Sequence, residues 1–274
     1  MSGLSEVDSA LCVLEESVSA SDKAPRLFSD LITKLRKVQS KWPKVTGAKQ
    51  EKLRSAATKL VCTAYHNVGI MRFNNGNYAS CVPLLKLASP MHASLEKRHQ
   101  CQLLAARGML ALSLQFGQYG STNIDGEAEK STKQQHVAYI EDAITLLHGS
   151  MECLKKRESP DDSGAATSQL LASLTLEMAI ARSRLAFLKT SIESQHGSAF
   201  ELAISTWSEV LAGQNLDGVP VGEKENANSK QPFLCQADRD THQFKWAKHA
   251  WQYLMAIADQ LALMQVPALE VLLF

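Results

Sequence analysis

Hydrophobic residues recur every three or four positions along almost the whole chain, which is the spacing of one face of an α-helix. Pro43, the Gly76-Asn77 pair and the Ser89-Pro90 pair divide this pattern into separate segments. We find no strand pattern of useful length, in which hydrophobic and polar residues would alternate. The predicted helices cover residues 4–20, 26–42, 47–75, 78–89, 95–117, 136–155, 165–191, 197–213 and 237–265, and a further one begins in the last residues, "VPALEVLLF".

Two long polar stretches, 118–135 and 214–236, interrupt the helical pattern, and we expect both to be loops. We also expect the chain to end inside a helix, so that its last segment is truncated. The predicted organisation is an N-terminal helix pair, a central group of helices, further pairs and truncated C-terminal helices, at 1–43, 44–117, 136–213 and 237–274 respectively.

The stretch "AYHNVGIMRFNNGNYASCVPLLKLA", residues 64–88, has the most regular pattern in the chain. It resembles a tetratricopeptide repeat, whose unit is a helix, a tight turn and a second helix. Phe73 stands at the second aromatic position, and the usual final proline is displaced to Pro90, which predicts a short second helix. Over 62–90, the residues that match the packing and turn positions of the repeat are Tyr65, Val68, Gly69, Gly76, Tyr78, Cys81, Leu85 and Ala88.

The packing of two helices and the turn between them require these residue types at these positions. Small residues at Gly69 and Cys81 allow two helices to cross closely, and Gly76 permits the positive φ with which many helices end. We therefore predict an all-α fold, an α-solenoid of antiparallel, tetratricopeptide-like helix pairs with about nine to ten helices. Each pair is too small to bury its own apolar face, so neighbouring pairs would stack. A compact helical bundle is the competing architecture.

Irregular repeats with long polar insertions also look like the helical region of separase, the protease that cuts cohesin at anaphase. The phrases "NVGIMRFNNGNYASCVPLLKLA" and "ADQLALMQVPALEVLLF" have the style of that region. This resemblance implies a non-catalytic arm that binds the inhibitor securin and positions substrate during chromosome segregation. The cysteine endopeptidase domain of such a parent would lie beyond Phe274, so we predict that this chain is not itself an enzyme.

Composition and charge limit the compartments and partners that we expect for the protein. The net charge of the 274 residues is +1, so no global field draws the chain to nucleic acid or to an anionic membrane. The N-terminus lacks the pattern of a signal peptide, and no apolar run reaches the roughly 18 residues of a membrane helix. We expect an intracellular protein, cytoplasmic or nuclear, with protein partners and without a membrane.

The sequence offers few residues for catalysis or metal binding. The six cysteines are widely spaced and include no Cys-x-x-Cys pair. Cys62 and His66 lie four apart on one helical face, but packing is the preferred interpretation over a thiolate-imidazole pair. His92 and His99 flank a helix start without a carboxylate at metal-ligand spacing. We therefore predict no catalytic residue, no metal and no cofactor.

Two charged segments have alternative interpretations. Residues 34–59 hold nine Lys or Arg against one Glu, which is typical of a solvated face; the alternative is a landing surface for an acidic partner or for nucleic acid. Lys224-Glu225-Asn226 resembles a degradation signal read by the anaphase-promoting complex, although chance explains a tripeptide better.

The first helix of a tetratricopeptide unit lines a concave surface, and this defines the predicted binding groove. The mixture of apolar and neutral polar groups there suits an extended or helical peptide, and it lacks the cations that clamp a C-terminal carboxylate. We predict a non-catalytic scaffold that captures peptides or proteins, with a stand-alone adaptor, an enzyme fragment and a nucleic-acid or chromatin module as alternatives. The predicted groove residues are Thr63, His66, Ile70, Phe73 and Asn74.

Overall fold

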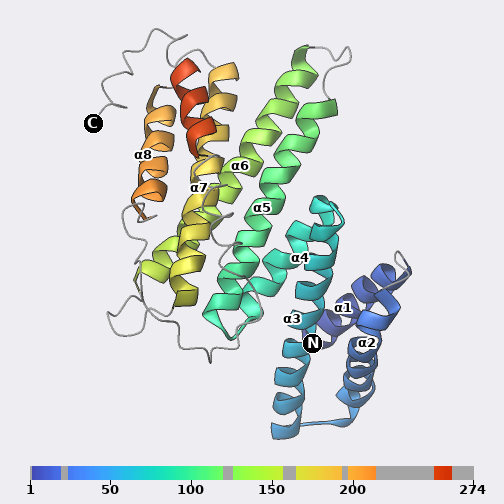
Figure 1. Cartoon of the computed structure of the whole chain (residues 1–274). Coiled ribbons are helices and arrows are strands. Elements are labelled where there is room, and N and C mark those ends of the chain that lie inside the picture. Colours follow the sequence, from blue (N-terminus) through green and yellow to red (C-terminus); the bar gives the residue numbers. More distant parts are fainter. Residues whose placement is uncertain are drawn as a thin grey trace. The chain divides into compact units, whose positions relative to one another are not determined.

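The chain folds into helices throughout the part that the structure describes. This computed structural model describes residues 2–19, 24–119, 126–156, 165–192, 197–213 and 250–260. Within these ranges the backbone is helical apart from short turns, and none of them contains a strand (Figure 1). The prediction of an all-α protein is therefore confirmed.

Residues 250–260 are helical, and a short 3-10 helix, Trp42–Lys44, follows α2. The other helices are α1 (Ser2–Ser19), α2 (Ala24–Lys41), α3 (Ala48–Asn74), α4 (Tyr78–Met91), α5 (Leu95–Tyr119), α6 (Gly126–Lys155), α7 (Ala165–Ile192) and α8 (Gly197–Gly213).

Seven of these helices begin and end within two residues of the predicted positions, and α6 differs. It begins at Gly126, so residues 126–135 are helical although a loop over 118–135 was predicted from their polarity. The segment "GEAEKSTKQQ" is polar but rich in Glu, Ala, Lys and Gln, which are strong helix formers. The predicted loop at 214–236, with Lys224-Glu225-Asn226, lies outside the described residues, as do parts of the predicted helix at 237–265.

The chain forms two compact units. Unit 1 comprises Met1–Ile124 and Thr145–Ser150, and unit 2 comprises Asp125–Ile144 and Met151–Phe274. Unit 1 contains the segment that resembles a tetratricopeptide repeat and all five predicted groove residues.

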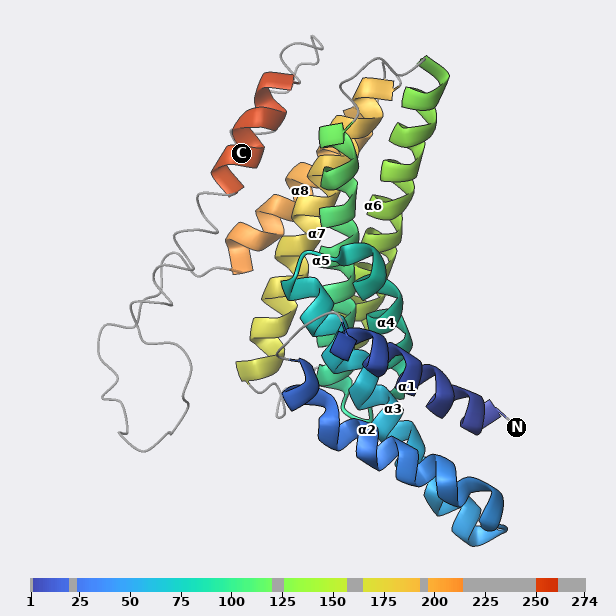
Figure 2. The same cartoon turned by 90° about the vertical axis from the view of Figure 1, so that its right-hand side faces the viewer.

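Consecutive helices of unit 1 pack in antiparallel fashion. In the α1–α2 pair, Arg36 Nη2 lies 2.8 Å from Glu15 Oε1, and Gln39 Nε2, farther along α2, donates over 2.8 Å to Oδ1 of Asp8, which lies earlier on α1. Figure 2 shows the two helices side by side. Helix α3 packs against both α1 and α4, and α4 packs against α5. The shared core includes Val7, Leu14, Phe28, Leu35, Val61, Tyr65, Val68, Leu85, Ala88 and Cys101.

The turn between α3 and α4 is a Schellman motif centred on Gly76. The N–H of Gly76 donates to the carbonyl of Phe73 over 3.0 Å, and the N–H of Asn77 donates to that of Arg72 over 2.8 Å. Gly76 has a φ of +74°, a conformation that a residue with a Cβ rarely adopts, as expected from the sequence. These bonds satisfy the last carbonyls of α3 and turn the chain back at a fixed residue.

Helices α3 and α4 approach each other closely at Gly69. A Cβ added there would lie 2.8 Å from Leu85 Cδ2 and 2.9 Å from Leu85 Cγ, which is closer than van der Waals contact. Leu85 is fully buried, so its side chain would have to shift within the core to make room for an added Cβ. Gly108 plays the same part between α5 and α4, because a Cβ there would lie 2.8 Å from Val82 Cγ2. Glycine at both positions therefore fixes how the three helices cross.

Unit 2 is organised around Trp207 of α8, whose side chain is completely buried. Its Nε1 donates to Ser183 Oγ of α7 over 2.9 Å, and its ring stacks on Tyr253 with centroids 5.5 Å apart. Phe187 and Phe200 form a second, edge-on aromatic contact between α7 and α8. Trp207 thus joins α7, α8 and the 250–260 helix into one core.

We expect Gly69→Leu to lower the free energy of unfolding by about 1–3 kcal/mol, because the added side chain would overpack the crossing with Leu85. The melting temperature, followed by circular dichroism, should fall by several degrees. The matched control is Gly149→Leu on α6, where an added Cβ has nothing within 4 Å. That variant should be at least as stable as the original chain, because leucine has a higher helix propensity than glycine. Equal stability of both variants would contradict the close crossing.

Replacing Ser183 by Ala should leave the buried Trp207 N–H without its acceptor. A buried unsatisfied donor costs about 1–3 kcal/mol, so urea unfolding followed by tryptophan fluorescence should show a lower midpoint. Ser173→Ala, on the same helix, removes a hydroxyl that bonds only its own helix at the surface, over 3.0 Å to the Gln169 carbonyl. The two midpoints should differ clearly, and coincident midpoints would count against the Trp207 hydrogen bond.

Candidate functional site

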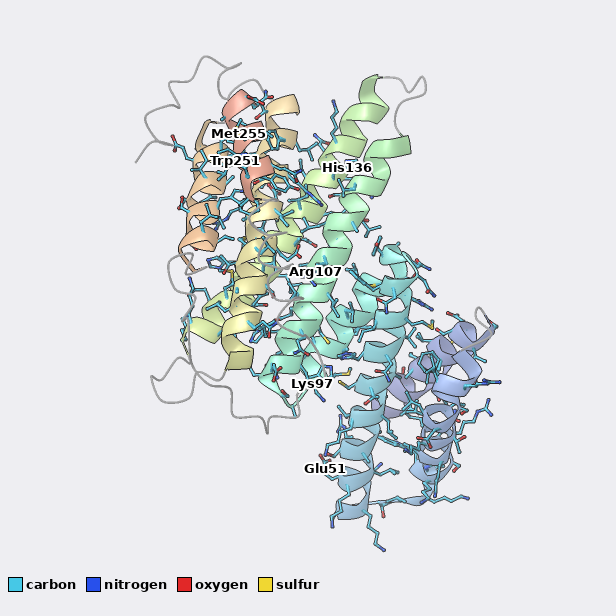
Figure 3. The ribbon with its side chains drawn as sticks, in the orientation of Figure 1. Glu51, Lys97, Arg107, His136, Trp251 and Met255 are labelled. Atoms are coloured by element: carbon cyan, nitrogen blue, oxygen red, sulfur yellow. The ribbon has the colours of Figure 1, made fainter. Side chains whose placement is uncertain are left out.

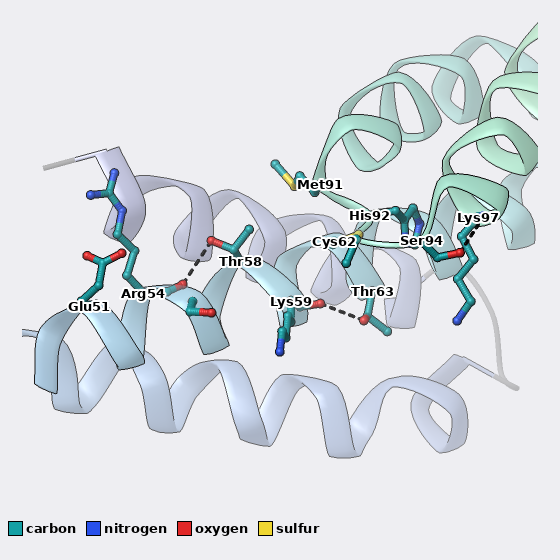
Figure 4. Close-up of a pocket in the computed structure, with 12 residues that line it drawn as sticks. Glu51, Arg54, Thr58, Lys59, Cys62, Thr63, Met91, His92, Ser94 and Lys97 are labelled. Atoms are coloured by element: carbon teal, nitrogen blue, oxygen red, sulfur yellow. Dashed lines mark hydrogen bonds between the residues drawn. The ribbon is translucent and has the colours of Figure 1, made fainter. Parts of the chain in front are cut away.

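A pocket of about 650 Å³ runs along α3 and includes one of the predicted groove residues, Thr63 (Figure 4). One wall is a single face of α3, and the other is the segment that ends α4 and begins α5. We call it the α3 pocket; its lining residues are Glu51, Arg54, Ser55, Thr58, Lys59, Cys62, Thr63, Met91, His92, Ala93, Ser94 and Lys97.

Three cations and one acid line the α3 pocket. The cations Arg54, Lys59 and Lys97 are exposed, and the acid is Glu51. The positions of Glu51 and Lys97 can be followed in Figure 3. The Thr63 hydroxyl donates to the Lys59 carbonyl over 2.8 Å, which leaves its oxygen able to accept a further bond. The pocket therefore combines net positive charge with neutral hydroxyl groups.

The structure does not gather the predicted groove residues in one place. Thr63 lines the α3 pocket, and Asn74 is exposed at the far end of the helix. Ile70 is half-buried, and the ring of Phe73 packs edge-on against Tyr78 with centroids 5.4 Å apart. His66 is half-buried and contacts His92 and Cys101 instead of facing an open groove.

The pocket also differs from the predicted groove in charge. The predicted groove contained no Lys or Arg, because only Thr63, His66, Ile70, Phe73 and Asn74 were assigned to it. The pocket lies nearer the start of α3, where Arg54 and Lys59 project, and Lys97 reaches it from α5.

His66, His92 and Cys101 form a compact group beside the α3 pocket, which we call the His–Cys cluster. Their side chains come from α3, from the residue that follows α4, and from α5. His66 Nδ1 lies 2.7 Å from His92 Nε2 and 3.2 Å from Cys101 Sγ. The two imidazole rings meet edge-on at 88°. In the part of the chain that the structure describes, this is the one group of three potential metal ligands whose donor atoms all lie within 4.8 Å of one another.

Burial determines the protonation of the cluster. It lowers the pKa of His66, as do the nearby charges of His92 and Lys97, and it lowers the pKa of His92 together with Lys97 and Arg98. Burial also raises the pKa of the Cys101 thiol to about 12, with a further contribution from Cys62. At neutral pH the metal-free cluster is therefore two neutral imidazoles and a thiol.

The other residues considered from the sequence lie outside the cluster. The Cys62 thiol donates to the carbonyl of Ala88 over 3.6 Å, and His99 is buried with its Nδ1 2.7 Å from Gln102 Oε1. Sequence reasoning paired Cys62 with His66 and His92 with His99, and so missed Cys101. That residue lies 35 positions from His66 and is brought close only by the packing of α3, α4 and α5.

The basic segment 34–59 is distributed over α2, the 3-10 helix and α3, and all nine of its Lys and Arg residues are exposed. Lys34 forms an ion pair with Asp30 and Arg36 with Glu15. Of the nine cations of this segment, only Arg54 and Lys59 line the α3 pocket. Binding of nucleic acid by the segment stays a prediction.

Comparisons with models of known protein families, with curated proteins and with solved structures gave no match. The resemblances to tetratricopeptide repeats and to separase therefore stay predictions. Among the described residues, no helix has both the length and the apolar character needed to cross a membrane.

The cysteine environments predict an order of alkylation. Cys12 is exposed, whereas Cys81 and Cys101 are fully buried with pKa values raised to about 11 and about 12. The hydrogen bond to Glu16 raises the pKa of Cys12 as well, but that thiol is exposed. Because Cys101 is completely buried and the pKa of its thiol is raised to about 12, it should react far more slowly with iodoacetamide at pH 8 than Cys12.

Peptide mapping by mass spectrometry, on reduced protein with EDTA present, measures these rates. In urea the difference should disappear. Equal rates for Cys12 and Cys101 in the native protein would contradict the burial of Cys101.

Proposed function

We propose that this chain is a non-catalytic, helical-repeat scaffold that binds an acidic peptide segment of a partner protein in the α3 pocket. The observation that carries the proposal is the placement of Arg54, Lys59 and Lys97 around a pocket that runs along one helix. In this proposal the antiparallel pairs of unit 1 are units of a solenoid, and α3 is the first helix of its tetratricopeptide-like unit.

The length of the pocket favours a peptide. Its α3 wall extends from Glu51 to Thr63, or about 18 Å at the helical rise per residue. An extended chain advances about 3.3 Å per residue, so this wall matches five or six residues of a bound strand. The Thr63 hydroxyl and its neighbours Thr58 and Ser94 can hydrogen-bond peptide groups, while the cations select acidic side chains.

The expected affinity is modest. The cations of the pocket are exposed, so each ion pair with a peptide would contribute at most about 1 kcal/mol and would weaken with salt. Their arrangement on two walls nevertheless gives selectivity, because a basic peptide would meet only repulsion from three of the lining residues.

The cellular setting is part of the same proposal. The five described cysteines are free thiols, which suits a reducing compartment such as the cytoplasm or nucleus. A securin-like partner follows only if the separase resemblance holds. A stand-alone adaptor would use the same pocket with another acidic partner.

The proposal is tested by selecting 12-residue peptides from a phage-displayed random library on the purified chain. Enriched peptides should carry several Asp or Glu residues. Fluorescence anisotropy should show at least tenfold weaker binding of these peptides to Lys59→Glu, because the substitution reverses one charge in the pocket.

Lys37→Glu is the matched control, since it makes the same charge change on the exposed face of α2, away from the pocket. The control should bind the peptides nearly as well as the original chain. Equal losses in both variants would indicate a general charge effect, and selection of basic or uncharged peptides would overturn the proposal. Tight binding of a single-stranded oligonucleotide, weakened equally by both variants, would favour the nucleic-acid alternative instead.

A further inference from the structure

Three potential metal ligands converge on one point beside the α3 pocket. His66 Nδ1 has two close neighbours, His92 Nε2 at 2.7 Å and Cys101 Sγ at 3.2 Å. The three residues come from separate elements, and the closest two in sequence, His92 and Cys101, are nine positions apart, so no single helical turn places them together by default. Their convergence results from the packing of α3, α4 and α5.

Hydrogen bonding alone does not satisfy this arrangement. A ring nitrogen of a neutral histidine carries either one proton or one lone pair, so His66 Nδ1 makes one good hydrogen bond and not two. Yet both His92 Nε2 and Cys101 Sγ approach this same atom. The two neutral imidazoles and the thiol each carry a proton of their own, so one of the two contacts at His66 Nδ1 lacks a well-directed hydrogen bond and has room for an additional partner.

A metal ion supplies that partner, because it accepts a lone pair from every ligand at once. With zinc–nitrogen bonds of about 2.0–2.1 Å and a zinc–sulfur bond of about 2.3 Å, tetrahedral ligands lie roughly 3.3–3.6 Å apart. The cluster's donor atoms, all within 4.8 Å of one another, need only small side-chain rotations to reach these separations. Two imidazoles with one thiolate suit zinc better than they suit calcium or magnesium, which prefer oxygen ligands.

We propose that His66, His92 and Cys101 bind one zinc ion through Nδ1, Nε2 and Sγ respectively, with the fourth coordination position directed to the α3 pocket. The proposal goes beyond peptide binding and does not depend on it. Binding releases the Cys101 thiol proton to solvent, so that the thiolate coordinates the metal. The remaining position is left for a water molecule or for an oxygen of a bound molecule.

The residues around the His–Cys cluster indicate how a metal ion would enter and which side chains would bind it. His92 lines the α3 pocket, which provides an entry path for the ion. Cys62 lines the same pocket, but its thiol engages the Ala88 carbonyl at 3.6 Å, so we place it outside the set. Lys97 and Arg98 lie close enough to lower the pKa of His92, which keeps its imidazole neutral and able to coordinate a metal ion.

The experiment titrates the full-length, metal-free chain, prepared with EDTA and a non-thiol reductant, with Co²⁺ and then with Zn²⁺. We expect one Co²⁺ per chain, with the visible bands of a tetrahedral site and a near-ultraviolet thiolate-to-cobalt band, and we expect one equivalent of Zn²⁺ to displace it. Cys101→Ser should abolish the thiolate band and weaken Zn²⁺ binding by about 100-fold or more.

His92→Ala provides a second variant, since His92 lies half-buried in a turn and its loss should leave the helices intact. It should weaken zinc binding while retaining the circular dichroism spectrum of the original chain. The matched control is Cys81→Ser, which makes the same change at another fully buried cysteine, on α4. The control should keep both the stoichiometry and the thiolate band.

Two results would overturn the proposal. The first is the absence of saturable Co²⁺ or Zn²⁺ binding by the folded original chain, which would make the cluster a metal-free hydrogen-bonded group. The second is equal loss of binding in Cys101→Ser and Cys81→Ser, which would assign the metal to other thiols. Neither result would change the expected binding of acidic peptides beside Lys59. The zinc proposal and the peptide proposal can therefore be contradicted independently.

Discussion

The close contact between α3 and α4 at Gly69 is the constraint on which unit 1 depends. A hydrogen atom in place of a side chain lets Leu85 fill the space between the helices, and the positive φ of Gly76 turns the chain back at the right residue. Gly108 repeats the arrangement between α5 and α4. At both crossings the absence of a Cβ on glycine lets an α4 side chain pack against the neighbouring helix. The two glycines therefore determine how α3, α4 and α5 pack, and with this packing the positions of His66, His92 and Cys101.

The α3 pocket and the His–Cys cluster follow from the same packing. The antiparallel turn after α4 brings residues 91–97 against the face of α3 that carries Lys59 and Thr63. Cys101 enters from the next turn of α5, where it is completely buried. The binding surface and the candidate metal ligands are therefore neighbours, although the chain order separates them. Unit 2 holds its helices by other means, above all the buried Trp207.

Much of the fold could be predicted from the sequence, because amphipathic period and helix-ending residues are local signals. Gly76 was expected to carry a positive φ, and it does. The start of α6 was not predicted, since polarity was given more weight than the helix propensity of Glu, Ala, Lys and Gln. The α3 pocket was predicted only in part. Arg54 and Lys59 belong to the basic segment 34–59, for which an acidic partner was the alternative interpretation, but Lys97 comes from α5, outside both that segment and the repeat pattern.

The His–Cys cluster was missed for a different reason. The sequence spacings that indicate a metal site describe ligands within one turn or loop. His66 and Cys101 are 35 residues apart, and only the register of two successive helix crossings makes them neighbours. Once the α3–α4 turn is placed at Gly76, His92 falls about one turn beyond Ala88, and Ala88 lies opposite Cys62. Pairing the residues of the two predicted antiparallel helices with each other across the turn at Gly76 would have placed His92 near His66.

A nuclear Overhauser spectrum of the full chain with labelled leucine methyl groups tests the central claim most directly. The account predicts a strong cross-peak between the α-protons of Gly69 and a methyl group of Leu85, because an atom placed on Gly69 would lie 2.8 Å from Leu85 Cδ2. The absence of that cross-peak in the folded protein would contradict the α3–α4 crossing, and with it the positions of the pocket and the cluster.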